Sequence, residues 1–349
     1  MTFPYIHDID PFAIQLWGNF GIRWYGLAYL TGFVLGYLII SWMQKRSLTP
    51  LPAKAIGDFV FWIAVGTVAG GRLGYCLFYR PELFVEFTSA PPFWGVFAVN
   101  KGGMASHGGM IGIVVACILF ARKHHQSPLH LFDLTILAAT LGIFFGRIAN
   151  FINGELVGRI CPADFPLAVK FPQDILSWPY YEPQRLAQLA DVVALKGVHK
   201  ETWASWVSQV TTSNQAWNSI NSTLEMVVAS VQNGNEQLKL ALGPLLDPRY
   251  PSQLFAALLE GGLIFLILMY VWRKPRKPGV ITALFFILYA IGRIINEQFR
   301  LPDLHIGYQL FSLTRGQWLS IGLLAAGLVC YFFWSRAKRA PLGGWAKRV

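Results

Sequence analysis

The chain has 349 residues, of which 54% are hydrophobic and only 13% are charged, and its formal net charge is +11. Soluble domains are closer to one quarter charged, so this composition excludes an ordinary soluble globular protein. A basic soluble protein would suggest a nucleic-acid partner, but here the basic residues cluster in short loops between long apolar runs, and we expect no nucleic-acid partner.

The apolar runs predict membrane-spanning helices. Seven of them approach the roughly 20 residues that a helix needs to cross a bilayer core. They lie near residues 19–42, 57–79, 104–121, 130–151, 252–272, 280–299 and 316–334. The short alternating segments of an outer-membrane barrel do not occur. We therefore predict an all-α, polytopic membrane protein with about seven transmembrane helices in a lipid bilayer.

The basic loops predict its orientation. About half of the 29 basic residues fall in segments 44–55, 122–128 and 273–278 and in the tail after Trp334. The positive-inside rule assigns these segments to the cytoplasm. The N-terminus is then periplasmic and the C-terminus cytoplasmic, which requires an odd number of helices. No cleavable signal peptide is expected, because no basic residue precedes Arg23.

We expect three parts along the chain. Residues 1–152 hold transmembrane helices one to four, and residues 153–251 form a periplasmic segment. Residues 252–349 hold helices five to seven and a basic cytoplasmic tail. The periplasmic segment is too polar to span the membrane and too long for a simple connection, so its middle, about 177–245, is predicted to be an inserted helical cap.

Helical spacing in the cap supports this prediction. Apolar residues recur there at i, i+3, i+4 and i+7, at Leu224, Val227, Val228 and Val231. Three tryptophans either pack against this stripe or rest at the membrane interface, namely Trp203, Trp206 and Trp217.

Polar residues gather at the predicted periplasmic ends of the spans. They are Tyr25 in the first helix, Arg72 in the second, His107 in the third, Arg147 and Asn150 in the fourth, Arg249, Ser252 and Gln253 at the start of the fifth, and Arg293, Glu297 and Arg300 at the end of the sixth. A charge at bilayer depth costs roughly 2.5–3.5 kcal/mol on insertion scales. We therefore predict one functional pocket in the outer leaflet.

These residue types suit an anionic head group. Arg147 and Asn150 are three apart and share a helix face, and arginines bind phosphate with paired donors. Gly108 and Gly109 would let backbone N–H groups at a helix start approach an anion. His107 can take up a proton near neutral pH. The four cysteines and seven histidines show no ligand spacing, so we predict no metal and no other cofactor.

Structural interpretations stand beside these. His107 could cap its helix, Arg147 could pair with Glu155 or reach outward to water, and the charged stripe at the end of the sixth helix could be structural ion pairing. Arg72 could belong to either class. Asp133 is predicted to cap the fourth helix. Glu260 is expected to be neutral or paired, without an assigned role.

Two other functions compete with an enzyme. An anion or head-group transporter would need polar groups through the inner leaflet, where helices three, five and seven are nearly all apolar. A scaffold would use the polar residues only to lock helices together, and conservative changes at His107 would then alter stability alone.

A family resemblance rests on residues 146–158, which read GRIANFINGELVG. They match every fixed position of G-R-x-[GA]-N-F-x-N-x-E-x-x-G, the signature of the prolipoprotein diacylglyceryl transferases. Further matches are WYGL at 24–27, GGRLGY at 70–75, GGM at 102–104 with HGG at 107–109, RYPSQL at 249–254 with LEG at 259–261, and RII at 293–295 with FRLPD at 299–303. The resemblance covers nearly the whole chain except about 177–245.

This resemblance implies an enzyme of the bacterial inner membrane. It would move the diacylglyceryl group of phosphatidylglycerol to the lipobox cysteine thiol of prolipoproteins, forming a thioether and releasing glycerol 1-phosphate. The implied catalytic residues are His107, Arg147, Arg249 and Tyr25. The residues expected to bind substrate are Asn150, Glu155, Gly158, Arg72, Gly108, Gly109 and Arg300.

Roles follow from the chemistry of these side chains. Arg147 and Arg249 would hold the phosphate, and Asn150 and Tyr25 would position the head group. His107 would take the thiol proton or orient a group that does. A thiol has a pKa near 8.5, and cationic surroundings raise its thiolate fraction, so the need for a dedicated base stays open.

The chain departs from the family pattern in two places. The family often shows H-P-[ST]-Q-L-Y-E after the outer arginine, but Tyr250 stands in place of the histidine, and Phe255 and Ala256 replace the Tyr-Glu pair. Any role of that glutamate has no carrier here. The external loop is also longer than expected, and it could cover the site or contact substrate proteins.

Overall fold

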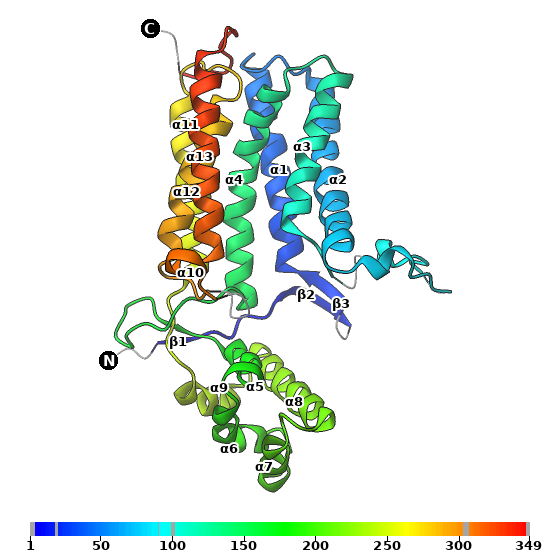
Figure 1. Ribbon diagram of the computed structural model, residues 1–349, viewed down its shortest axis with the longest axis vertical. Helices are drawn as coiled ribbons and strands as arrows, with labels where there is room; N and C mark the ends of the chain where they lie inside the picture. The colour runs from blue at the N-terminus through cyan, green and yellow to red at the C-terminus, as the bar shows by residue number, and fades with distance from the viewer. Residues whose placement is uncertain (1–3, 18–19, 90, 99–101, 303–306, 347–349) are drawn as a thin grey trace. The chain divides into compact units, whose positions relative to one another are not determined.

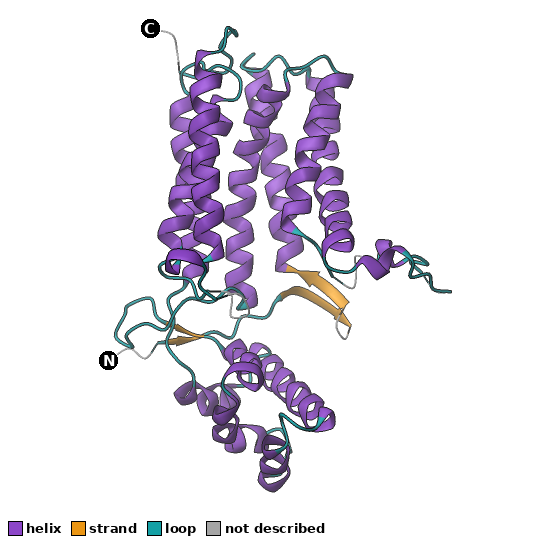
Figure 2. Cartoon of the chain, viewed as in Figure 1, coloured by secondary structure: helices purple, strands orange, loops and turns teal. Residues whose placement is uncertain are grey.

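The computed structural model describes residues 4–17, 20–89, 91–98, 102–302 and 307–346, and these are mostly helical (Figure 2). Within the described residues, six helical segments are long and apolar enough to cross a membrane: 24–45, 53–78, 106–123, 128–153, 252–272 and 315–336. The remaining predicted span corresponds to α12 (Val280–Asn296), an apolar helix of 17 residues. The count of seven and the orientation stay predictions.

The chain forms two compact units, whose boundaries cut across the long helices. Unit 1 comprises residues 1–29, 143–260 and 292–320, and unit 2 comprises 30–142, 261–291 and 321–349. The three-part division drawn from the sequence follows membrane topology rather than contacts, and it stays a prediction.

Unit 2 is built from long helices (Figure 1). Some of them continue into unit 1. They are α1 (Trp24–Lys45), α2 (Ala53–Phe78), α3 (Ser106–Lys123), α4 (Pro128–Asn153), α11 (Leu263–Trp272), α12 and α13 (Arg315–Arg336). Each is rich in apolar residues, and many large side chains such as Leu38 and Phe61 are exposed, as expected where lipid covers a helix.

Glycines bring α2 and α3 into close contact. A Cβ atom at Gly112 of α3 would lie 1.9 Å from the carbonyl oxygen of Gly66, and one at Gly70 of α2 would lie 2.4 Å from that of Gly108. Small residues four apart let membrane helices approach this closely. Gly108 is therefore a packing residue in this structure.

Asp133 joins two helices of unit 2. Its buried carboxylate accepts hydrogen bonds from the N–H of Gly279 (2.7 Å) and from the N–H and hydroxyl of Thr282 (2.8 and 2.7 Å). The prediction that Asp133 caps the fourth helix is wrong. The residue lies inside α4, which begins at Pro128, and it instead satisfies unpaired N–H groups at the start of α12.

The C-terminal tail folds back over the end of α11. Arg276 and Leu342 form a backbone bridge, and the Trp272 indole donates to the Leu342 carbonyl at 3.0 Å. Gly343 has a positive φ of 79°, and a Cβ there would lie 2.1 Å from the indole nitrogen. Only glycine allows the chain to pass so close to the ring. The sequence predicted no more than a basic tail.

Unit 1 contains two short sheets (Figure 2). Strands β1 (Tyr5–Ile6) and β4 (Val169–Lys170) pair in parallel, and β2 (Phe12–Trp17) and β3 (Phe20–Arg23) form an antiparallel hairpin. The first helix therefore begins at Trp24 rather than near residue 19. An apolar run of this length does not distinguish strand from helix by periodicity.

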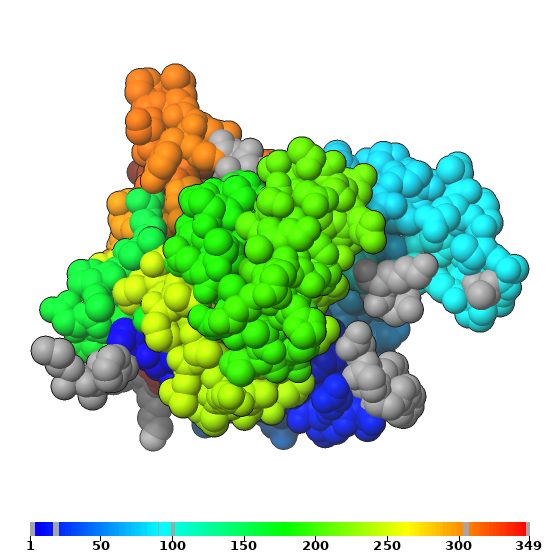
Figure 3. All heavy atoms as spheres, turned by 90° about the horizontal axis from the view of Figure 1, so that it is seen from below, coloured from blue at the N-terminus to red at the C-terminus, as the bar shows by residue number. Residues whose placement is uncertain are grey.

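The cap of unit 1 is a small helical cluster. Its helices are α5 (Trp178–Tyr181), α6 (Ala190–Ala194), α7 (Lys200–Ser208), α8 (Asn214–Gln232) and α9 (Glu236–Leu242). In Figure 3 their green and yellow-green atoms gather on one face. The Ser213 and Asn235 side chains accept hydrogen bonds from the first turns of α8 and α9, as N-caps do.

The predicted stripe of α8 is confirmed as the buried face of this cap. Its four apolar residues are 0–5% exposed. Trp203 is buried and donates its indole N–H to the Leu186 carbonyl at 2.8 Å. Trp206 and Trp217 pack against the same core. The packing alternative for the tryptophans therefore holds.

His7 links the strands of unit 1 to the end of α4. Its ring is buried, and its centroid lies 5.3 Å from those of Phe151 and Phe171. Burial lowers the pKa of His7 from 6.5 to about 4, because the charged imidazolium loses its hydration.

We expect Gly112→Ala to lower the melting temperature of the detergent-solubilised protein. The added methyl would collide with the Gly66 backbone, and overpacking typically costs about 1–3 kcal/mol. Gly57→Ala in α2 is the matched control, because nothing lies within 4 Å of its Cβ position. Equal melting temperatures for both variants would contradict close glycine packing.

Acid should destabilise unit 1 through His7. The folded-state pKa lies below the unfolded value, so the unfolded chain binds more protons between pH 6.5 and about 4. Stability is then lost as pH falls through this window, by up to roughly 3 kcal/mol. Thermal melts of the wild type and His7→Leu at pH 7 and pH 5 would test this. We expect the wild type to lose more stability than the variant, and parallel losses would contradict it.

Candidate functional site

The signature segment closes α4 with a tight turn. Gly154 has a φ of +67°, its N–H donates to Phe151, and the N–H of Glu155 donates to the Asn150 carbonyl, both at 2.9 Å. A left-handed glycine commonly ends a helix in this way. A Cβ there would also lie 2.3 Å from the Gln173 side chain. The turn therefore brings Glu155 back beside the last turn of α4.

Three predicted site residues meet at this turn. The Tyr25 hydroxyl donates to the Glu155 carboxylate at 3.1 Å. The Asn150 amide donates to the Tyr25 hydroxyl and, at 3.4 Å, to Glu155. Asn153 donates to the other Glu155 oxygen at 3.3 Å. Asn150 is buried and Glu155 is exposed, so the cluster presents an oriented carboxylate and hydroxyl at the surface of unit 1.

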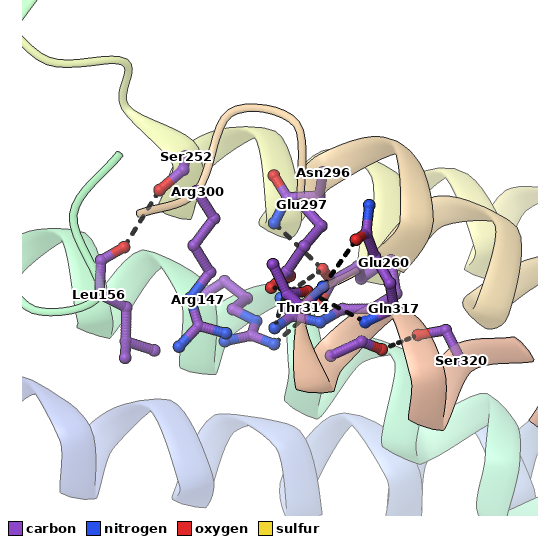
Figure 4. Close-up of polar contacts among 12 residues, drawn as sticks. Arg147, Leu156, Ser252, Glu260, Asn296, Glu297, Arg300, Thr314, Gln317 and Ser320 are labelled. Atoms are coloured by element: carbon purple, nitrogen blue, oxygen red, sulfur yellow. Dashed lines mark hydrogen bonds and ion pairs between the residues drawn. The ribbon is translucent and has the colours of Figure 1, made fainter. Parts of the chain in front are cut away.

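Arg147 pairs with Glu260 (Figure 4). The Glu260 carboxylate is fully buried in the π-helical segment Ala257–Gly262, and it accepts from Arg147 at 2.8 Å, from Arg293 at 3.3 Å and from Asn296 at 3.2 Å. The suggested pairing of Arg147 with Glu155 is wrong. The Glu155 oxygens accept hydrogen bonds from Tyr25, Asn150 and Asn153. Burial without a paired cation would destabilise the Glu260 carboxylate more than the exposed Glu155 carboxylate, so Arg147 pairs with Glu260.

A second carboxylate extends this network. Arg293 forms an ion pair with Glu297 at 3.0 Å, and the Thr314 hydroxyl donates to Glu297 at 2.9 Å. A Cβ at Gly316 would lie 2.9 Å from the same carboxylate, so glycine leaves room for it. The ion pairing predicted for the stripe of the sixth helix is confirmed for this pair.

Three guanidinium groups gather at this network. Figure 4 shows Arg147 and Arg300 pointing into the same region beside Glu260 and Glu297, and Arg293 pairs with both of these carboxylates. Clustered guanidinium groups offer several oriented N–H donors, which suits the binding of an anion.

Arg249 is held by a different partner. Its guanidinium forms a buried ion pair with Asp174 and donates to the Gly158 carbonyl at 3.0 Å. A Cβ at Gly158 would lie 2.1 Å from the Tyr250 carbonyl oxygen, so this crossing of two backbone segments requires glycine. Arg249 and Gly158 therefore contact each other and fix the local chain path.

Residues 157–161 connect the two arginine-bearing segments. On one side the N–H of Leu301 donates to Val157 (3.2 Å), and on the other that of Tyr250 donates to Arg159 (3.0 Å). The Arg159 side chain donates to the carbonyls of Arg300 (3.0 Å) and Glu297 (3.4 Å). These hydrogen bonds hold the turn after α12 in place. The carbonyl groups at the C-terminal end of a helix carry partial negative charge, and they therefore attract the Arg159 guanidinium.

The remaining predicted residues belong to unit 2. Arg72 is buried and donates to the carbonyls of Gly95, Val96, Gly102 and Gly103 at 2.7–3.0 Å, which favours its structural interpretation. It shapes the loop that leads into α3. His107 is exposed in the first turn of that helix and makes no capping hydrogen bond, so the capping interpretation is wrong.

Gly109 does not offer its N–H to an anion. That group donates to the Ala105 carbonyl at 3.0 Å as part of the helix. Gly108 lies in the contact with α2 described above. The prediction of an anion-binding N–H is therefore wrong for Gly109, whereas for Gly108 it stays a prediction beside its packing role.

Comparison with known proteins identifies the family. The family model described as prolipoprotein diacylglyceryl transferase matches residues 11–333. The chain belongs to the prolipoprotein diacylglyceryl transferase family. A Bdellovibrio bacteriovorus protein named phosphatidylglycerol–prolipoprotein diacylglyceryl transferase is 53% identical over 98% of this chain and 97% of its own length. Proteins of the same name from Rhodospirillum rubrum and Idiomarina loihiensis are 35% and 32% identical, over 96% and 92% of this chain and 96% and 91% of their own lengths.

The chain is thus a diacylglyceryl transferase with an aromatic cluster where it departs from the family pattern. The Tyr250 and Phe255 rings lie 5.4 and 5.2 Å from the Phe299 ring, and Phe165 packs on Tyr250 at 5.0 Å. The two substituted residues therefore share one partner at the end of α12. Ala256 is buried and supplies no carboxylate.

Sequence reasoning left three site residues of this transferase without a role. Glu260 is a charge inside the most apolar span, a signal that a buried cation must face it. Arg159 directly follows the signature, although nothing in its spacing reveals the carbonyls it binds. Asp174 lies in an irregular stretch of the external loop, and no local pattern marks it as the partner of Arg249.

Arg159→Ala should lower kcat on the order of tenfold to a hundredfold, because a small displacement of the charged turn is enough to misplace its contacts. Arg159→Lys, which keeps the charge and one donor, should recover part of the rate. Arg80→Ala, in an exposed pair with Glu82, is the control. Turnover is measured per folded protein alongside a melt. A lower melting temperature with unchanged kcat would show a purely structural role.

Proposed function

We propose that this enzyme transfers the diacylglyceryl group of phosphatidylglycerol to the lipobox cysteine thiol of prolipoproteins. The observation that carries this proposal is the gathering of the Arg147, Arg293 and Arg300 guanidinium groups beside Glu260 and Glu297. Guanidinium groups bind phosphodiester oxygens through paired N–H donors. The names of the relatives support the same two substrates.

Arg147 is the proposed phosphate-binding group. Its contact with the buried Glu260 fixes the orientation of the guanidinium, and an oriented donor loses little entropy when it binds. As the ester bond breaks, negative charge builds on the phosphate, and a preorganised cation stabilises that charge more than it stabilises the ground state. Arg300 is proposed to add a second contact.

The reaction is a displacement at carbon. The thiol sulfur attacks the glyceryl carbon that carries the phosphate ester, a C–S bond forms and the C–O bond breaks. Glycerol 1-phosphate leaves with the bonding electron pair. The thiol proton passes to a base, which we propose to be the exposed imidazole of His107, because histidine is the side chain that most often acts as a general base.

Tyr25, Asn150 and Glu155 are proposed to position the head group. Their mutual hydrogen bonds orient the Tyr25 hydroxyl and the exposed carboxylate, which can accept hydrogen bonds from glycerol hydroxyls. Asn150 lies on α4 three residues after Arg147, so we propose that the head-group and phosphate contacts start from one face of this helix.

Arg249 and Gly158 are proposed to act by positioning. Asp174 already neutralises the Arg249 guanidinium in a buried pair, and breaking such a pair typically costs about 3–5 kcal/mol. Arg72, Gly108 and Gly109 likewise support the loop and helix that carry His107. These assignments replace direct substrate contact as the proposed role of the five residues.

The proposed location is the bacterial inner membrane, with the site on the periplasmic side. The charge bias of the loops supports this orientation, and the relatives are bacterial. The cap at 177–245 then faces the periplasm, the compartment in which we expect prolipoprotein substrates to present the lipobox.

The test is mass spectrometry of a lipobox peptide incubated with the purified protein and phosphatidylglycerol. We expect a mass increase of one diacylglyceryl group on the wild-type peptide and none on a Cys→Ser peptide. Arg147→Lys should reduce the rate about a hundredfold or more, because lysine keeps the charge but loses the planar paired donors. Arg80→Lys is the matched control.

Two outcomes would overturn these assignments. No product from folded wild-type protein would refute the reaction. Full turnover by Arg147→Lys would refute the phosphate role of that residue while leaving the reaction intact. Movement of phosphatidylglycerol across a vesicle without peptide modification would favour the transporter alternative instead.

A further inference from the structure

We propose that the β2–β3 hairpin is a membrane-interface anchor, whose apolar face lies among lipid head groups and the adjoining acyl carbons. The hairpin precedes α1 without a linker, since β3 ends at Arg23 and the helix begins at Trp24. The inference concerns a lipid surface, and it does not depend on the transfer reaction proposed above.

One face of the hairpin is apolar and unusually exposed. Ile14 and Ile22 are cross-strand partners, so their side chains share a face, and Leu16 lies in the bulge that follows on the same strand. Their exposed fractions are 55%, 42% and 54%. Three large aliphatic residues together at a surface usually mark an interaction site.

The two strands of the hairpin pair with each other along their length. A two-stranded hairpin by itself is at best marginally stable in water, and burial of its exposed aliphatic side chains against another surface would stabilise it. The exposed face therefore suits a covering partner.

Continuity with a membrane span selects lipid as that partner. Trp24, the first residue of α1, is 39% exposed, and tryptophan is enriched at the level of the head groups. Arg23 lies over the Phe12 ring at 4.6 Å and places a cation where the hairpin joins α1, which suits anionic lipid.

The anchor would fix the depth of Tyr25. This residue lies two positions after Arg23, and its hydroxyl contacts Glu155 and Asn150. A hairpin held in the interface prevents the first turn of α1 from moving along the membrane normal. The proposed head-group cluster would then stay at head-group level.

Spin labelling in lipid nanodiscs tests the anchor directly. Single-cysteine labels are placed at Ile14 and Ile22 in a Cys330→Ser background, because the other cysteines are buried. Leu38 on α1, 53% exposed, is the lipid reference, and Met226 on the cap, 47% exposed, is the matched aqueous control. Accessibility to oxygen, which concentrates in lipid, is compared with accessibility to a water-soluble nickel chelate.

We expect the labels at 14 and 22 to give an oxygen-to-nickel ratio several-fold above that at 226 and close to that at 38. A ratio like that at 226 would overturn the proposal, because the hairpin would then lie in water. Low accessibility to both reagents with dipolar broadening would also overturn it, because the face would be covered by a second copy of the chain. Either result leaves the peptide assay for the transferase reaction unaffected.

Discussion

A buried negative charge organises the candidate site. Glu260 lies in the most hydrophobic of the spans and is shielded from solvent, so its carboxylate is tolerable only if cations and donors reach it. Arg147 from α4 and Arg293 and Asn296 from α12 satisfy this demand. The glutamate thereby holds two helices in register and leaves the arginines oriented. The orientation of the arginines that we propose to bind phosphate thus follows from the free-energy cost of burying a carboxylate.

A second set of contacts fixes the chain segments next to this network. Residues 157–161 bridge the turn after α12 and the segment before α10 (Ser252–Ala256). Gly158 permits the close crossing, Arg249 and Asp174 lock it, and Arg159 fixes the carbonyls beside Arg300. Arg249 and Gly158, which the sequence predicted as site residues, make structural contacts with each other here, and we propose that they act by positioning other groups. Loss of activity on their substitution would therefore not by itself show contact with substrate.

Local patterns predicted the helices well and the connections poorly. Long apolar runs and the α8 stripe identified elements whose stability depends on their own periodicity, and the Arg293–Glu297 pair followed from i, i+4 spacing. The strand at 20–23 was missed because its pairing partner, not its composition, makes it extended. Asp133 was predicted to cap its own helix, and the neighbouring Glu155 was one alternative partner for Arg147, because spacing reveals only local partners. Their actual partners are 146 and 113 residues away.

The sequence by itself determined that this is a helical membrane protein of the prolipoprotein diacylglyceryl transferase family, and it named Tyr25, Arg147 and Asn150 as site residues. Hydrophobicity, loop charge and the signature are properties of single segments, and they can be read without knowing the fold. Which arginine faces which carboxylate was decided only by the tertiary structure. Pairing of buried charges depends on helices that are distant in the chain, and the free energy of each pair arises only when packing removes both partners from water.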